Sequence, residues 1–172
     1  MFGRSDVDAE AEFEDFVASA WPRLRWSAYL LCGDHHLAED LAQTALTRTY
    51  SAWPRVRRAD ALAYTRKVLV NLNIDRLRRR HFRVVDDTAL AGMDGGPGTA
   101  PSDQRDELVR LLLELSPRER KVVVLRHYYD LSEADVAAEL GWARGTVKST
   151  LSRALSKMRV SAEALEATQG KA

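Results

Sequence analysis

Residues 84–102 interrupt this chain of 172 residues with a composition that suits neither a helix nor a strand. The segment contains four glycines, two prolines and three aspartates, and it has no basic residue. Glycine and proline break regular structure, and so long a stretch without secondary structure is uncommon inside one compact domain. We therefore predict a first domain over residues 8–83, a flexible acidic linker over 84–102 and a second domain over 103–165.

Apolar residues on both sides of this segment recur at spacings of three and four, and no alternating pattern persists. Leu24, Ala28 and Leu31 show this spacing, which places side chains on one face of a helix. The predicted fold class is therefore all-α: two small helical domains joined by a flexible linker, of which the second is a helix-turn-helix domain. In the first domain we expect helices over about residues 8–20, 22–32, 34–53 and 60–80, and Pro22 opens the second of them. The Asp34 carboxylate can cap the third helix, and Tyr50 lies on its apolar stripe.

Signals for helix starts are clearest in the second domain. Ser116, Pro117 and Glu119 form a capping box with proline at the first helical position, and Ser132 can cap the short helix that follows. Gly141 supplies a turn before the last helix. We expect helices over about residues 103–115, 117–128, 133–140 and from 144 past 158.

The formal net charge is only +1, but the charges are unevenly distributed along the chain. Residues 51–83 carry ten basic and two acidic side chains, and residues 141–172 carry six basic and two acidic ones. The first 20 residues and the predicted linker are acidic. One basic block would be most simply explained as a solvated helix face, whereas two blocks on separate bodies favour two nucleic-acid contacts.

Several classes of protein are disfavoured by the sequence. Cys32 is the only cysteine, so we predict no intramolecular disulfide and no thiolate zinc cluster, and its apolar neighbours predict a buried thiol. There is no signal-peptide pattern and no apolar run long enough to span a bilayer, which predicts a cytoplasmic protein with no membrane insertion. We predict no cofactor. His35 and His36 lie near three carboxylates, but adjacent histidines point to different sides of a helix, which argues against a metal-dependent hydrolase.

Residues 131–153 carry the strongest functional signal: a short helix, a glycine turn and a second helix. This pattern is typical of a DNA-binding helix-turn-helix, although plain structural corners share it. On the second helix we expect one buried stripe made of Val147, Leu151, Leu155 and Met158. The opposite face presents hydroxyls and long cations of the kind that reach base edges and phosphates: Arg144, Lys148, Ser149, Ser152 and Arg153.

A second polar stripe lies on the helix expected over residues 60–80. An asparagine amide can pair with a base edge and an arginine can hold a phosphate, so this stripe is also a candidate for DNA binding. Trp53 and Tyr64 could provide an aromatic platform for a single strand, and for Trp53 a place in the core is the favoured interpretation. The stripe consists of Lys67, Asn71, Asp75 and Arg78.

These stretches resemble the extracytoplasmic-function (group 4) sigma factors of the sigma-70 family, in their sigma-E-like branch. The resemblance covers about residues 10–160. It rests on AEDLAQ at 38–43, YTRK at 64–67, DRLRRR at 75–80, LSPRER at 115–120, LSEADVA at 131–137 and GTVKS at 145–149. Two positions depart from the family pattern. Ala143 stands where serine or threonine usually caps the recognition helix, and Thr150 stands where arginine is common, so a phosphate contact is expected to be missing.

The resemblance implies a non-catalytic subunit that directs core RNA polymerase to promoter DNA. It implies binding to the β′ clamp through Asp40, Gln43 and Arg48, docking of the second domain on the β flap, and an anti-sigma factor as a further partner that the family allows. It assigns the −35 duplex to Arg144, Thr146, Lys148, Ser149, Ser152 and Arg153. It assigns the single-stranded −10 element to Arg57, Arg58, Asp60, Lys67, Asn71, Asp75 and Arg78.

The alternative from another class is a stand-alone helix-turn-helix regulator whose first domain binds a ligand or partner. Such a protein would bind duplex DNA tightly by itself and would ignore core polymerase. Co-purification with core enzyme therefore distinguishes the two hypotheses.

Overall fold

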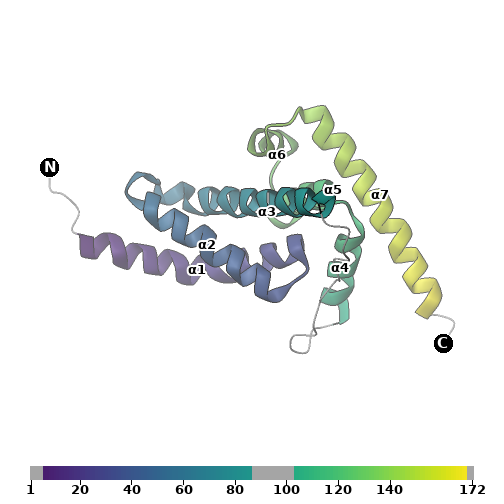
Figure 1. The fold of residues 1–172 in the computed structure, drawn as a ribbon, viewed down its shortest axis with the longest axis horizontal. Coiled ribbons are helices and arrows are strands. Elements are labelled where there is room, and N and C mark those ends of the chain that lie inside the picture. The colour runs from purple at the N-terminus through teal and green to yellow at the C-terminus, as the bar shows by residue number, and fades with distance from the viewer. Residues whose placement is uncertain (1–5, 87–102, 170–172) are drawn as a thin grey trace. The chain divides into compact units, whose positions relative to one another are not determined.

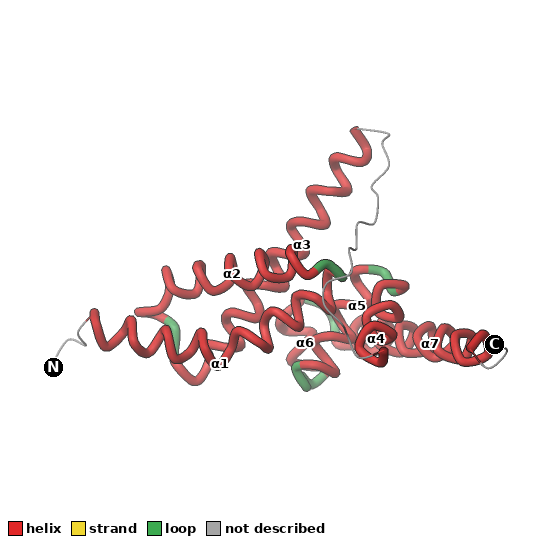
Figure 2. The backbone as a smooth tube through the Cα atoms, turned by 90° about the horizontal axis from the view of Figure 1, so that it is seen from below, coloured by secondary structure: helices red, strands yellow, loops and turns green. Residues whose placement is uncertain are grey.

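The computed structural model describes residues 6–86 and 103–169, and within these ranges every regular element is a helix (Figure 1, Figure 2). The all-α fold class predicted from the apolar spacing is confirmed. The chain divides into two compact units, Met1–Gly96 and Pro97–Ala172, each with its own buried apolar residues. Among the described helices, none combines the length and the apolar character that a membrane span requires.

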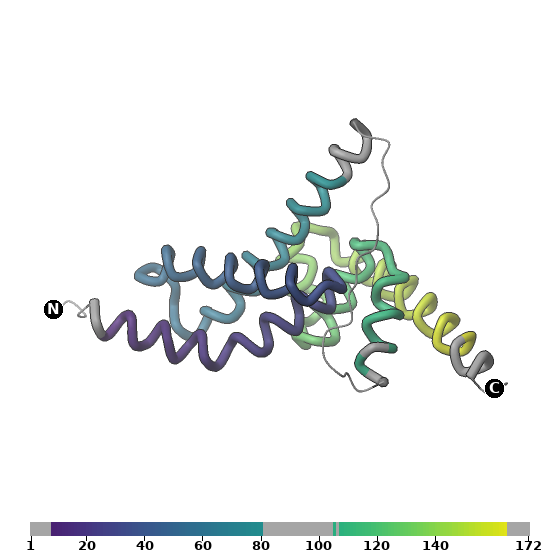
Figure 3. The backbone as a smooth tube through the Cα atoms, turned by 60° about the horizontal axis from the view of Figure 1, so that its bottom comes forward, coloured from purple at the N-terminus to yellow at the C-terminus, as the bar shows by residue number. Residues whose placement is uncertain are grey.

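The first unit contains three long helices: α1 (Asp6–Cys32), α2 (His35–Ala52) and α3 (Ala61–Asp86). Two short 3-10 turns, η1 (Trp53–Arg55) and η2 (Arg58–Asp60), connect α2 to α3. α1 and α2 run antiparallel and side by side, and α3 packs against both (Figure 3). As predicted, the Asp34 carboxylate caps α2, because it accepts a hydrogen bond of 2.9 Å from the backbone N–H of Leu37.

One prediction for this unit is wrong, since α1 continues through Pro22 instead of breaking there. An internal proline removes a hydrogen bond and clashes with the preceding turn, which costs about 3 kcal/mol. On one side of the proline Phe13 packs against Trp53, and on the other side Leu24 and Ala28 are fully buried. Tertiary packing on both sides therefore outweighs the local penalty.

The core of the first unit combines leucines with many alanines. Ala28, Ala38 and Ala42 are fully buried where the helices meet, and short side chains permit close helix packing. The buried hydroxyls of Thr49 on α2 and Thr65 on α3 lie 3.0 Å apart and form a hydrogen bond between the two helices. These buried hydroxyls are therefore satisfied within the core.

Two side chains of this unit are more exposed than their apolar surroundings predict. Tyr50, placed on the apolar stripe of α2, is 48% exposed and lies with its ring centroid 4.8 Å from that of Phe13. Cys32 is half-buried, and its thiol donates to the backbone oxygen of Asp34 at 3.3 Å. Both lie at the edge of the helix pack, where one side of a residue remains open to water.

The second unit contains α4 (Asp103–Glu114), α5 (Pro117–Val123), a π-helical turn η3 (Val124–Tyr128), α6 (Glu133–Leu140) and α7 (Arg144–Gln169). Both predicted serine caps are confirmed. Ser116 and Glu119 form a reciprocal capping box on α5, and Ser132 forms one with Asp135 on α6. Gly141 ends α6 with φ of +66°, a left-handed conformation that glycine adopts without strain.

A buried arginine connects α4 to α5. Arg120 donates to the backbone oxygens of Leu112 at 2.7 Å, Leu113 at 3.0 Å and Leu115 at 3.0 Å. These carbonyls lie at or just beyond the C-terminal end of α4, where helix carbonyls lack intrahelical partners. One guanidinium therefore satisfies the end of α4 and fixes the corner between the two helices.

The apolar stripe predicted on α7 is only partly correct. Val147 and Leu151 are buried, but Leu155 is 40% exposed and Met158 is half-buried. The buried line instead passes through Thr150, 1% exposed, and Ala154. These buried residues recur at spacings of three and four and face α5 and α6, against which α7 packs. Leu155 lies outside this line.

α3 extends through Asp86, so this helix includes the first three residues of the linker predicted over 84–102. Residues 87–102 lie outside the described part of the chain. The linker therefore stays a prediction from composition.

Candidate nucleic-acid interface

The exposed face of α7 carries the polar side chains that were singled out on the last helix. Five of the six residues are exposed: Arg144, Lys148, Ser149, Ser152 and Arg153. Thr146 is half-buried, one position before the buried Val147. The helix thus separates an apolar side, which packs on its own unit, from a side of cations and hydroxyls that is accessible to a ligand.

The turn before α7 fixes where this face begins. The Trp142 N–H donates to the Ala137 oxygen at 2.9 Å, and the Ala143 oxygen accepts from Thr146 at 3.0 Å and from Val147 at 3.2 Å. Ala143 directly precedes α7, as expected, and its methyl group has no oxygen to cap the first turn. The guanidinium Nε of Arg144 lies 3.9 Å from a Glu133 carboxylate oxygen, and this arginine is largely exposed.

Thr150 requires a correction. From the resemblance we expect Thr150 at a position that faces phosphates, but its side chain is buried on the core side of α7. Its hydroxyl oxygen has no hydrogen-bond partner, so the residue contributes volume to the core and its polar group remains unsatisfied. The departure from arginine at this position therefore leaves the exposed face of α7 unchanged.

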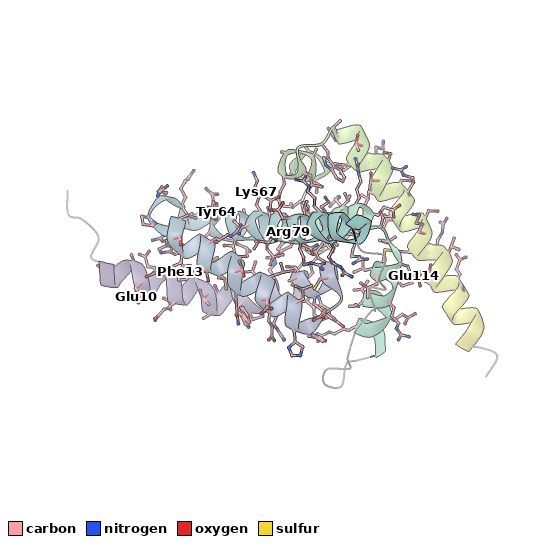
Figure 4. All side chains as sticks on the ribbon, in the orientation of Figure 1. Glu10, Phe13, Tyr64, Lys67, Arg79 and Glu114 are labelled. Carbon is pink, nitrogen blue, oxygen red and sulfur yellow. The ribbon has the colours of Figure 1, made fainter. Side chains whose placement is uncertain are left out.

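The polar stripe on α3 is fully accessible. Lys67 lies on the exposed side of α3 together with Tyr64 (Figure 4), and Asn71, Asp75 and Arg78 are exposed further along the helix. These side chains occupy the face of α3 opposite the buried Leu69 and Leu72. Arg79 and Arg80 are also exposed at this end of α3. The stripe joins one amide, one carboxylate and two cations on one helix face.

The segment between α2 and α3 is tied to α1. Trp53 is 2% exposed, which confirms the interpretation that it belongs to the core. Its indole Nε1 donates to the Ala9 oxygen at 3.0 Å, and its ring centroid lies 4.9 Å from that of Phe13 and 5.3 Å from that of Phe16. Tyr64, by contrast, is 39% exposed, so a base could reach its ring.

Arg58 differs from the other cations of this segment because its guanidinium is engaged within the unit. Nε donates to Glu12 Oε2 at 2.7 Å, and Nη1 donates to the oxygens of Trp53 at 3.2 Å and Val56 at 3.3 Å. The guanidinium also lies 3.8 Å from the centroid of the Trp53 ring, a cation–π contact. Its neighbour Arg57 is 84% exposed, with Nε 3.7 Å from a carboxylate oxygen of Asp60, which directly precedes α3.

The three candidates for binding core polymerase lie on α2. Asp40, Gln43 and Arg48 are all exposed, while Leu41 and Ala45 between them are buried. The helix is therefore amphipathic, with its polar face turned outward.

The two histidines do not form a metal centre. His35 stacks on Tyr29 with the ring centroids 3.9 Å apart and the planes at 11°. Within the described part of the chain, no group of three His, Cys, Asp or Glu side chains is placed to hold a metal ion. The structure thus offers no support for the hydrolase hypothesis.

A cluster of two cations on a tryptophan was not anticipated from the sequence. The guanidinium of Arg118 and the ammonium of Lys121 lie 4.1 Å and 4.8 Å from the centroid of the Trp142 ring. Burial lowers the pKa of Lys121, and the neighbouring charge of Arg118 lowers it further. The sequence signal for this cluster was Trp142, in the turn of the helix-turn-helix. Its two cationic partners lie more than 20 residues earlier in the chain, so the sequence did not show which residues contact the ring.

Both units of the chain are similar to regions of one known protein family. Residues 16–83 match the family model "Sigma-70 region 2", and residues 105–158 match "Sigma-70, region 4". The RNA polymerase sigma-E factor of Streptomyces avermitilis is 40% identical over 151 residues, covering 86% of this chain and 83% of the relative. The ECF RNA polymerase sigma factor SigL of Mycobacterium tuberculosis is 35% identical over 170 residues, covering 92% and 91%.

A solved structure of a sigma factor is similar to this chain. The sigma factor RpoE from Bartonella quintana, crystallised with the anti-sigma factor NepR, aligns with a TM-score of 0.71 and 28% sequence identity. The alignment covers 86% of this chain and 94% of the RpoE chain.

Proposed function

The chain belongs to the extracytoplasmic-function sigma factors of the sigma-70 family, and from this premise we propose how its residues perform that task. As a sigma factor, it binds core RNA polymerase and directs promoter-specific initiation of transcription. A stand-alone regulator is not favoured, because both units match sigma regions in the order in which the family carries them.

In the proposal α7 reads the −35 element in the major groove. The observation that carries this assignment is the division of α7 into a buried apolar side and an exposed side of cations and hydroxyls. Arg144, Lys148 and Arg153 supply charge for phosphates or guanine edges, and Ser149 and Ser152 supply short hydroxyls. Thr146 lies at the edge of this surface and contributes through its half-exposed side chain.

The −10 element is read as a single strand by α3 and by the segment before it. Lys67, Asn71, Asp75 and Arg78 form the helix part of this surface, and Arg57 and Asp60 form the part in the segment between α2 and α3. Extracting a base from the stack costs a few kcal/mol, which contacts with the extracted base must offset. We assign Arg58 to the organisation of this segment, because its donors are directed to Glu12 and to backbone oxygens.

Core polymerase is held at two places in the proposal. Asp40, Gln43 and Arg48 on α2 bind the β′ clamp, and the second unit docks on the β flap. Two weak DNA contacts then act together, because tethering to one enzyme gives the second contact a high effective concentration. The net charge of +1 is consistent with poor DNA binding by the isolated chain.

The protein contributes binding and positioning and has no catalytic step of its own. It acts in the cytoplasm, where core polymerase is. Like the RpoE chain crystallised with NepR, it is a candidate for control by an anti-sigma factor.

The test of the −35 assignment uses reconstituted holoenzyme and a promoter whose −35 element is either intact or replaced. Lys148→Ala and Arg153→Ala each remove an exposed cation from the proposed surface, and each should weaken binding to the intact promoter by about 1–3 kcal/mol if the side chain contacts a base. Core binding should not change. The matched control is Lys157→Ala, which removes the same charge from α7 at a position where the ammonium is already paired with Glu119 at 2.8 Å. Loss of core binding in the first two variants, or equal promoter defects in all three, would contradict the assignment.

A further inference from the structure

The segment between α2 and α3 is short of regular hydrogen bonds and depends on side chains for its conformation. Its backbone bonds are local: Val56 N–H reaches the Ala52 and Trp53 oxygens at 3.2 and 3.3 Å, and Asp60 N–H reaches the Arg57 oxygen at 2.9 Å. Single turns of this kind are weak by themselves. Contacts from elsewhere in the unit must therefore hold residues 53–60 in one conformation.

Arg58 provides the centre of these contacts. A guanidinium presents its donors in a rigid planar fork, and here the fork reaches two backbone oxygens of the segment while its face lies on the Trp53 ring. The Trp53 ring is itself anchored to α1 by a hydrogen bond to Ala9. Arg58 thus connects the Trp53 and Val56 backbone oxygens to each other and to the Trp53 ring.

Glu12 is the group that orients Arg58. It lies 46 residues away in the sequence, on α1, and its carboxylate accepts the shortest of the hydrogen bonds found on Arg58, 2.7 Å. The side chains of Glu12 and Arg58 are 37% and 32% exposed, so the pair is partly shielded from water. Glu10 and Glu14, its acidic neighbours on α1, are exposed.

We propose that Glu12 is a positioning residue for −10 recognition: through Arg58 it fixes the conformation of residues 53–60, in which Arg57 is presented to the DNA strand. This inference rests on the proposed role of that segment. Glu12 also offsets the charge of Arg58, which would otherwise attract DNA phosphates without regard to sequence. Glu12 thereby gives the two adjacent arginines different roles: Arg58 holds the segment and Arg57 contacts DNA.

The test compares holoenzymes that carry the wild-type chain or Glu12→Gln, a substitution that removes the charge and keeps the shape. Transcription is measured from a promoter and from variants with single base changes in the −10 element. The ratio of activities between the preferred and the substituted base should fall about fivefold in Glu12→Gln, the size expected for a partly exposed charged hydrogen bond. Core affinity and dependence on the −35 element should not change. Glu10→Gln, with the same charge change on an exposed position of α1, should keep the wild-type ratio.

Two additional measurements distinguish positioning from a general loss of stability. Hydrogen exchange of the holoenzyme should become faster in residues 53–60 and should stay unchanged in the middle of α2. The double variant Glu12→Gln/Arg58→Ala should be no worse than Arg58→Ala, because Glu12 acts only through Arg58. If Glu12→Gln does not fold, Arg58→Lys, which keeps the charge and loses the planar fork, must show the same loss of discrimination.

The outcomes separate this inference from the function on which it rests. If the wild-type holoenzyme discriminates among −10 bases and Glu12→Gln retains that ratio within twofold, the role of Glu12 is overturned. If Arg57→Ala, Asn71→Ala and Glu12→Gln all leave discrimination unchanged, the proposed −10 surface itself is wrong.

Discussion

Replacement of Arg120 by methionine should destabilise the second unit strongly, because one buried guanidinium satisfies three backbone oxygens at the end of α4. Methionine fills a similar volume without donors, so the carbonyls of Leu112, Leu113 and Leu115 lose a charged partner. A hydrogen bond to a charged group contributes about 1.5–3 kcal/mol, and bonds to one group do not add fully. We therefore expect a loss of about 3–4 kcal/mol.

Calorimetry of the full chain measures this loss against an internal reference. A change of 1 kcal/mol moves the midpoint of a domain of this size by about 4–8 °C, so the transition of the second unit should fall by at least about 12 °C. The transition of the first unit should not move, since Arg120 belongs to Pro97–Ala172. Hydrogen exchange of α4 and α5 shows which of the two calorimetric transitions belongs to the second unit.

A matched substitution two residues earlier controls for the loss of an arginine as such. Arg118→Met removes an exposed guanidinium that stacks on Trp142, a contact worth about 0.5–1 kcal/mol at such a site. A midpoint for Arg120→Met that lies within 3 °C of the Arg118→Met value would refute the reasoning, because the three hydrogen bonds would then contribute no net stability. The midpoint of Arg120→Lys should lie between those of the two methionine variants, since one ammonium reaches fewer of the carbonyls.

Three further outcomes are expected from the same structure. The pKa of Glu119 is lowered from its ordinary value of 4.5, chiefly by the hydrogen bond with Lys157. This carboxylate therefore stabilises the fold above its unfolded pKa, and the contribution is lost as the pH falls through the lower folded pKa. In calorimetry the difference in midpoint between Glu119→Gln and wild type should shrink between pH 7 and pH 3, and an unchanged difference would contradict this linkage. Ala143→Ser supplies the missing cap of α7 and should raise the free energy of unfolding of the second unit by about 1 kcal/mol in urea titration, whereas no gain would show that the first turn is already satisfied by other groups. Asn71→Ala should reduce opening of duplex promoters in permanganate footprinting while leaving the protein's melting midpoint within 2 °C, because the side chain is exposed; an unchanged footprint would remove Asn71 from the −10 surface.

The sequence by itself determined the fold class and most of the polar faces of α3 and α7. Apolar spacing and capping residues are local properties, so Asp34, Ser116 and Ser132 marked helix starts without any knowledge of packing. The exposed stripes on α3 and α7 followed from the same periodicity, because a helix that buries one side must present the other to water.

Only the tertiary structure decided which cations are engaged within the fold and which are exposed. Arg57 and Arg58 are adjacent in the sequence, yet one is largely exposed and the other is held by a carboxylate on α1. Likewise Thr150 was assigned to the surface and lies in the core, and Pro22 was expected to break a helix that packing keeps intact. Each difference depends on groups brought together from distant positions, and the energies of such contacts exceed the local preferences that a sequence displays.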